Sequence, residues 1–138
     1  MAKRLWTAAF WVYLAVLLRI TVFRTGWYAN GFFHGDIEIL PFQEIFTYLN
    51  PNQWFDVTYL FFGNIGWFLP FGAYLAWCGK SLAFGTLTGF CLSLTIEVFQ
   101  FVFSSGHSST EDLILNTLGA FLGWLIFSQI RKKFTKDL

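Results

Sequence analysis

The sequence predicts an all-α membrane protein, a bundle of four transmembrane helices with a short interfacial helix in the outer loop between the first and second spans. Hydrophobic residues make up 56% and charged residues 12% of the 138 positions, a balance typical of integral membrane proteins. Four apolar stretches reach the length of about 20 residues that a helix needs to cross a bilayer. No repeat or second domain is visible, so residues 1–138 are expected to form a single domain.

The first apolar stretch, Leu5–Phe23, follows the basic start "MAKR". A basic start before an apolar run is also typical of a signal peptide. Arg19 interrupts the run, however, and no small-x-small cleavage site follows it. These two features favour a retained first span.

The other three stretches are Tyr59–Trp77, Leu82–Phe103 and Leu113–Ile130. The links "CGKS" and "SSGHSS" between them are short and rich in turn residues, as between antiparallel neighbours in a bundle. Cys78 and Cys91 have neither CxxC nor metal-ligand spacing, so we expect small core residues and no metal or cofactor.

The outer connection, residues 25–58, is too polar to cross a membrane. In "LPFQEIFTYLN", Pro41 suits a first helical position, and an i, i+3, i+4, i+7 apolar stripe follows it. This pattern predicts an interfacial helix with aromatic anchors at headgroup depth, namely Trp27, Tyr28, Tyr48 and Trp54. A lid packed over the bundle is the alternative.

Basic residues near the ends of spans mark the cytoplasmic side of a membrane protein. If the four spans alternate, one side receives Lys3, Arg4, Lys80 and the basic cluster that follows the fourth span. The opposite loops contain acidic residues and no lysine or arginine. Both termini are therefore expected in the cytoplasm.

Polar side chains from all four predicted spans fall at one depth, near the outer end. Because an ionised group in hydrocarbon is costly, such residues normally face a bundle interior or a watery cavity. We therefore expect a polar pocket open to the outer leaflet, with Glu97 and Asp112 as candidate acid and base. Its lining is predicted to be Arg24, Asn64, Glu97, Gln100, Asp112 and Asn116, with Ser93 on the same face.

Simpler structural roles are also consistent with these residues. Asp112 could complement the helix dipole, and Ser108 with Glu111 has capping-box spacing. Amide side chains could serve as interhelical hydrogen-bonding groups, and Arg24 could extend to the outer headgroups. Four further residues are predicted to shape the helices, either by loosening the second span or by permitting close helix contact: Pro70, Gly72, Gly119 and Gly123.

Several segments together resemble the VanZ-like family of bacterial membrane proteins. They are "ILPFQEI", "FFGNIGWFLPFGAYL", "SLTIEVFQFVF" and "STEDLILNTLGAFLG". The resemblance is most specific over residues 39–126. It implies a bacterial cytoplasmic membrane protein associated with low-level resistance to teicoplanin, a glycopeptide antibiotic that carries an acyl chain.

Three classes of function fit these features. The favoured one is a non-catalytic envelope factor that binds a membrane lipid, a lipid-linked cell-wall precursor or an acylated glycopeptide. The alternatives are an intramembrane acid–base enzyme acting on a lipid-linked substrate, and a small proton- or ion-coupled transporter. A homo-oligomer is a further expected partner, above all for the transporter. The net charge of +1 and the absence of a basic patch before the last residues argue against a nucleic-acid partner.

Overall fold

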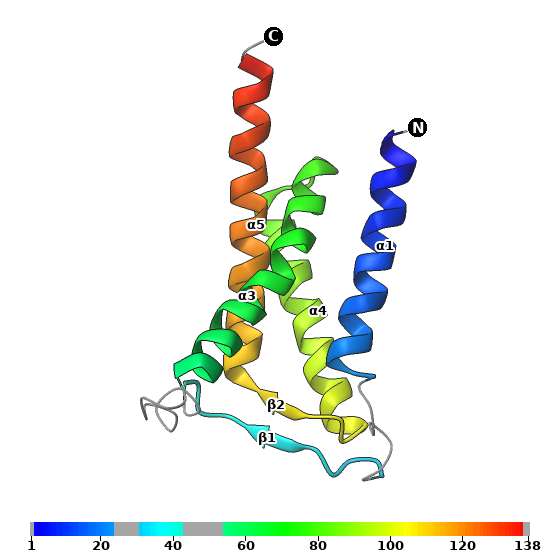
Figure 1. The fold of residues 1–138 in the computed structure, drawn as a ribbon, viewed down its shortest axis with the longest axis vertical. Coiled ribbons are helices and arrows are strands. Elements are labelled where there is room, and N and C mark those ends of the chain that lie inside the picture. Colours follow the sequence, from blue (N-terminus) through cyan, green and yellow to red (C-terminus); the bar gives the residue numbers. More distant parts are fainter. Residues whose placement is uncertain (1, 24–30, 43–53, 137–138) are drawn as a thin grey trace.

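The computed structural model describes residues 2–23, 31–42 and 54–136, which form a helical bundle closed at one end by a small β-ladder (Figure 1). The helices are α1 (Ala2–Thr21), α3 (Trp54–Trp77), α4 (Leu82–Val102) and α5 (Thr110–Lys136). The strands are β1 (Asp36–Glu38) and β2 (His107–Ser109). The start of α1 and the end of α5 lie at the end of the bundle opposite the strands (Figure 1).

Helices α3 and α5 make the most extensive contact in the bundle. They cross so closely that glycines face carbonyl oxygens of the other helix. A Cβ atom at Gly119 would overlap the carbonyl oxygen of Ile65, one at Gly123 that of Leu69, and one at Gly72 that of Ala120. Small residues that let helix backbones approach are the usual means of packing helices in membranes.

Helix α4 packs mainly against α5. Ser81 caps its first turn by accepting a hydrogen bond from the Phe84 N–H, which satisfies one of the free donors there. Gly89 lies against the Ala120 side chain of α5. The buried core at this junction includes Phe68, Phe71, Ile96 and Ala120.

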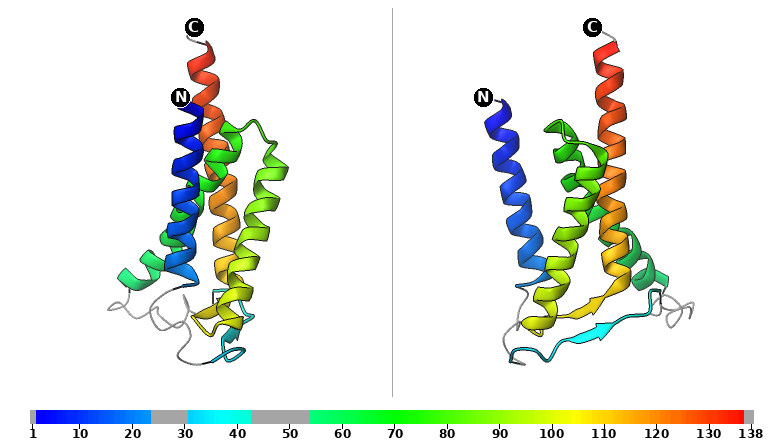
Figure 2. Two further views of the ribbon diagram at one scale, coloured as in Figure 1. Left: turned by 90° about the vertical axis from the view of Figure 1, so that its right-hand side faces the viewer. Right: turned by 180° about the vertical axis from the view of Figure 1, so that it is seen from behind.

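Helix α1 stands apart from the other helices and touches α3 and α4 over a small area (Figure 2). Its main attachment to α3 is aromatic. The Phe10 and Tyr74 rings stack with centroids 3.7 Å apart, and Phe10 also contacts Phe71. The α1 face away from α3 is exposed, as expected for a helix whose other surroundings are lipid.

Residues 31–42 cross the bundle end as an extended segment, which we call the outer strap. Its strand β1 pairs in parallel with β2, with Asp36 opposite His107 and Glu38 opposite Ser109. Before the ladder, the Phe33 N–H donates to the Val102 carbonyl at 2.9 Å, and the His34 N–H donates to the Ser104 hydroxyl at 2.9 Å. The described part of the outer connection is therefore a strap bound to the bundle.

The helical prediction is confirmed, with shifted bounds. Helix α3 begins five residues before the predicted Tyr59, and α5 begins at Thr110 instead of Leu113. Three helices are long and apolar enough to cross a membrane: α1, α4 and α5. The 24-residue α3 is not among them.

Two further expectations have different outcomes. The predicted interfacial helix lies almost wholly outside the described residues, and its predicted start at Pro41 is a turn at the end of the strap. The prediction that Cys78 and Cys91 are core residues is wrong, since both side chains are exposed on the bundle surface. Hydrocarbon surroundings are themselves apolar, so they do not drive a thiol side chain into the bundle core.

The glycine contacts predict a position-dependent effect of alanine. Gly123→Ala should lower the midpoint of thermal unfolding in detergent, because the added methyl group forces α3 and α5 apart and overpacking costs about 1–3 kcal/mol. Gly66→Ala on α3 is the matched control, since a Cβ there would meet no atom within 4 Å. Equal effects of the two substitutions would contradict the proposed packing.

Candidate functional site

Glu97 is the most buried acid in the described part of the chain, with 4% of its surface exposed. It lies on α4 near the outer strap. Its Oε2 atom accepts a hydrogen bond from the Ser109 N–H at 2.7 Å, and the Ser108 hydroxyl also hydrogen-bonds the carboxylate. Its Oε1 atom is buried and has no hydrogen-bond partner among the described residues. One carboxylate oxygen therefore holds the link before α5, while the other is available as an acceptor.

Gln100 lies one turn further along the same face of α4 and is also buried, at 8% exposure. Its Nε2 atom donates to the Thr21 carbonyl at 3.4 Å, which ties α4 to the end of α1. Its Oε1 atom is buried without a partner in residues 2–23, 31–42 and 54–136. Glu97 and Gln100 thus present two unpartnered buried acceptors on one helix face.

Asp112 and Asn64 connect the two tightly packed helices. The Asn64 amide Nδ2 donates to the Asp112 carboxylate Oδ1. Asp112 also lies near enough to Glu97 for the two carboxylate charges to interact. The structure therefore brings together side chains from α3, α4 and α5, as the shared depth in the sequence predicted.

Asn116 lies one turn further into α5 and faces α4. Its Nδ2 atom donates to the Ser93 hydroxyl at 3.0 Å, and both side chains are buried. This bond supports the interhelical role among the alternatives considered for Asn116. It also places the Asn116–Ser93 pair directly beneath Glu97 on the α4 face.

The remaining predicted residues have three different outcomes. Arg24 lies outside the described residues. Gly72, Gly119 and Gly123 lie in the α3–α5 contact, and Pro70 lines an apolar cavity beside α1 instead of the polar cluster. Where the structure describes the chain, no three His, Cys, Asp or Glu side chains gather in a way that could hold a metal ion.

Sequence reasoning missed two contributors to the cluster. One is the backbone N–H of Ser109. It was missed because every residue except proline has a main-chain donor, so the residue type does not reveal it. The other is Glu111, which the sequence analysis considered only as a capping-box partner of Ser108 and which is buried at 6% exposure. Its N–H donates to the Ser109 hydroxyl at 3.1 Å, so Ser109 rather than Ser108 caps α5. The i, i+2 spacing of Ser109 and Glu111 was the available signal.

Comparison with known proteins supports the family resemblance that the sequence segments indicated. Residues 10–131 match the VanZ/LLP1 family, which covers most of the chain. The chain belongs to the VanZ/LLP1 family. It is also similar to Protein VanZ of Enterococcus faecium, with 38% identity over 71 residues, which are 50% of this chain and 44% of the relative. The match thus spans less than half of that VanZ protein. No solved structure matches the chain.

The Asn64–Asp112 contact predicts energetic coupling in this VanZ/LLP1 domain. In a double-mutant cycle of Asn64→Ala and Asp112→Ala, unfolding free energies in detergent should deviate from additivity by about 0.6 kcal/mol, the average for membrane-helix hydrogen bonds. The control cycle pairs Asn64→Ala with Thr95→Val, because the Thr95 hydroxyl bonds only within its own exposed helix face. Additive effects in both cycles would show that the Asn64–Asp112 contact contributes no measurable free energy to folding.

Proposed function

We propose that this VanZ/LLP1 member is a multi-pass protein of the bacterial cytoplasmic membrane with both termini in the cytoplasm. It contributes to tolerance of teicoplanin-type glycopeptides, or to another envelope function, by binding the polar part of an amphiphile at the outer end of the bundle. The amphiphile is a membrane lipid, a lipid-linked cell-wall precursor or an acylated glycopeptide. Similarity to an enterococcal VanZ protein supports the resistance class.

The observation that carries the binding proposal is the pair of unpartnered acceptors, Glu97 Oε1 and Gln100 Oε1. A buried acceptor without a partner costs about 1–3 kcal/mol, more for a charged group. Both atoms belong to side chains one turn apart on the same face of α4. The complementary ligand is a hydrogen-bond donor: the hydroxyl and amide groups of a saccharide, or an amine.

The outer strap supports access from the membrane interface. Phe32 and Phe33 contact the rings of Phe103 and Phe101, yet most of the apolar surface of the strap is exposed. The exposed side chains are Phe32, Phe33, Ile37, Ile39 and Leu40. Exposed apolar groups at a bundle end are suited to the headgroup–acyl boundary of a bilayer. The strap would then hold the polar cluster at the depth where an amphiphile's headgroup meets its chain.

One observation favours a second candidate, an acid–base enzyme acting on a lipid-linked substrate. Glu97 and Asp112 are close enough for their charges to interact, and paired carboxylates in unlike environments can divide the roles of acid and base. Each is already held by a hydrogen-bond donor, Glu97 by Ser109 and Asp112 by Asn64. The binding function needs fewer assumptions than the enzyme, because Glu97 Oε1 and Gln100 Oε1 can accept hydrogen bonds without any change in their protonation.

The proposed topology predicts the location of four fusion sites. Reporter fusions after residues 50, 80, 107 and 138 should report outside, inside, outside and inside, because most lysines and arginines lie beyond the span ends on one side. Each site is fused to alkaline phosphatase, which is active outside, and separately to a fluorescent protein, which is fluorescent inside. The two signals should be opposite at every site, so each reporter serves as the control for the other. An external signal at residue 80 would overturn the orientation.

The proposed function predicts a selective phenotype. Expression in a susceptible Gram-positive host should raise the minimal inhibitory concentration of teicoplanin more than that of vancomycin. Glu97→Gln, Asp112→Asn and Asn116→Ala should abolish the increase without lowering membrane abundance, since single hydrogen bonds contribute only about 0.6 kcal/mol to such bundles.

Gln129→Ala, on an exposed part of α5, is the matched control and should keep full protection. If the three cluster variants are present at normal levels and still protect, the polar cluster has a purely structural role. If the wild-type protein protects against no glycopeptide, the resistance class is wrong.

A further inference from the structure

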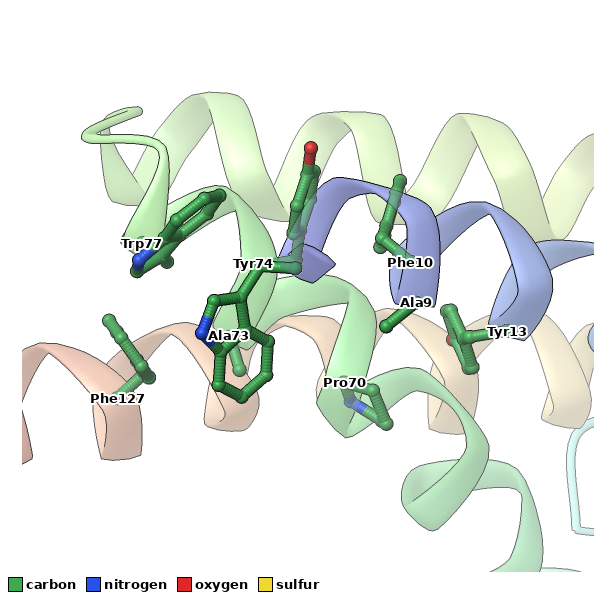
Figure 3. A pocket seen from close by; sticks show the side chains of 9 residues that line it. Ala9, Phe10, Tyr13, Pro70, Ala73, Tyr74, Trp77 and Phe127 are labelled. Carbon is green, nitrogen blue, oxygen red and sulfur yellow. The ribbon is translucent and has the colours of Figure 1, made fainter. Parts of the chain in front are cut away.

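A cavity of about 570 Å³ lies between α1, α3 and α5, away from the polar cluster. Figure 3 shows Ala9, Phe10 and Tyr13 of α1 facing Pro70 and Trp77 of α3, with Phe127 of α5 at one end. Its volume falls within the range of about 300–1,000 Å³ that is usual for ligand sites. The loose attachment of α1 leaves this space open between the helices.

The lining is mostly apolar, and its two tyrosine hydroxyls already have partners. The Tyr13 hydroxyl donates to the Trp67 carbonyl at 2.5 Å, and the Tyr74 hydroxyl lies 3.5 Å from the Thr7 hydroxyl. Water therefore has little to bind there, and an apolar cavity of this kind stays dry or takes an apolar ligand. Because α1 and α5 are apolar enough to cross a membrane, hydrocarbon chains are the apolar molecules beside the opening.

Basic residues flank, in sequence, the two tryptophans at one end of the cavity, and the Lys80 ammonium lies 5.4 Å from the centroid of the Phe84 ring of α4. The Trp6 and Trp77 rings lie 6.4 Å apart and close this end. Lys3 and Arg4 lie within one turn of Trp6, and Lys80 follows Trp77 by three residues; all three are exposed. The Trp124 indole donates to the Lys80 carbonyl at 2.9 Å, which holds that link against α5. Indole rings and cations at one level are typical of a membrane–water interface.

We propose that this cavity binds one acyl chain of an anionic phospholipid, whose phosphate lies among Lys3, Arg4 and Lys80. Apolar lining selects the chain, and charge complementarity selects the headgroup. Each Lys or Arg near an anionic headgroup strengthens binding by about fivefold. This lipid site lies at the end of the bundle opposite the polar cluster and does not depend on the proposed glycopeptide function.

Photocrosslinking tests the proposal. The full chain is reconstituted in phosphatidylcholine vesicles with a trace of phosphatidylglycerol or phosphatidylcholine bearing the same diazirine acyl chain. Crosslinked peptides are then identified by mass spectrometry. Residues 6–13 and 70–77 should be labelled, and phosphatidylglycerol should label them at least about fivefold more than phosphatidylcholine.

Two pairs of variants separate the parts of the proposal. Ala73→Trp should fill the cavity and remove labelling by both probes, whereas Ala83→Trp, on the exposed face of α4, should leave it unchanged. Arg4→Gln with Lys80→Gln should remove most of the phosphatidylglycerol preference, whereas Lys132→Gln with Lys133→Gln should keep it. Ala9→Trp fills the cavity from α1 and replaces Ala73→Trp if circular dichroism shows that the latter has lost helix.

Labelling of residues 6–13 and 70–77 that survives both cavity-filling variants would overturn the acyl-chain site. Equal labelling by the two probes in the wild-type protein would overturn the anionic selectivity. Neither result bears on the glycopeptide phenotype, which is measured with the cluster variants.

Discussion

The backbone contact between α3 and α5 sets the positions of most other groups in the bundle. Because glycines replace side chains at the crossing, the relative rotation and depth of the two helices are fixed by main-chain atoms. That register places Asn64 opposite Asp112 and turns the Asn116 face of α5 toward Ser93 of α4. Larger side chains at Gly119 or Gly123 would alter all of these distances together. The polar cluster is therefore a consequence of how closely two backbones approach.

Hydrocarbon surroundings place a second demand on the polar groups, since no water is available to replace a missing partner. Glu97 meets this demand partly through the main chain, with the Ser109 N–H as donor at 2.7 Å. Ser109 can serve because β2 is an extended segment whose backbone groups are not engaged in a helix. The outer strap holds β2 in that conformation through the ladder with β1. A structural element with no apolar core of its own thus supports the most buried acid of the described chain.

Much of the helical arrangement followed from residue type and spacing. Apolar runs located the helices, and the shared depth of Asn64, Glu97 and Asp112 anticipated their approach, because depth in a membrane is set by position in the span. The strap could not be predicted, since its three-residue strands join segments distant in sequence and carry no alternating pattern. The apolar cavity beside α1 was also missed. It depends on the loose packing of α1 and the placement of Pro70, and neither is visible in hydropathy.

The parallel pairing of the strap also imposes an order on biogenesis. His34 and its partner Ser104 lie 70 residues apart, so the strap is synthesised well before its docking surface. It can bind only after the end of α4 and β2, which supply its hydrogen-bond partners, have been synthesised. Ser109 becomes fixed in the ladder at the same step. The environment of Glu97 therefore forms late, and a chain arrested before β2 would lack the main-chain donor to this acid.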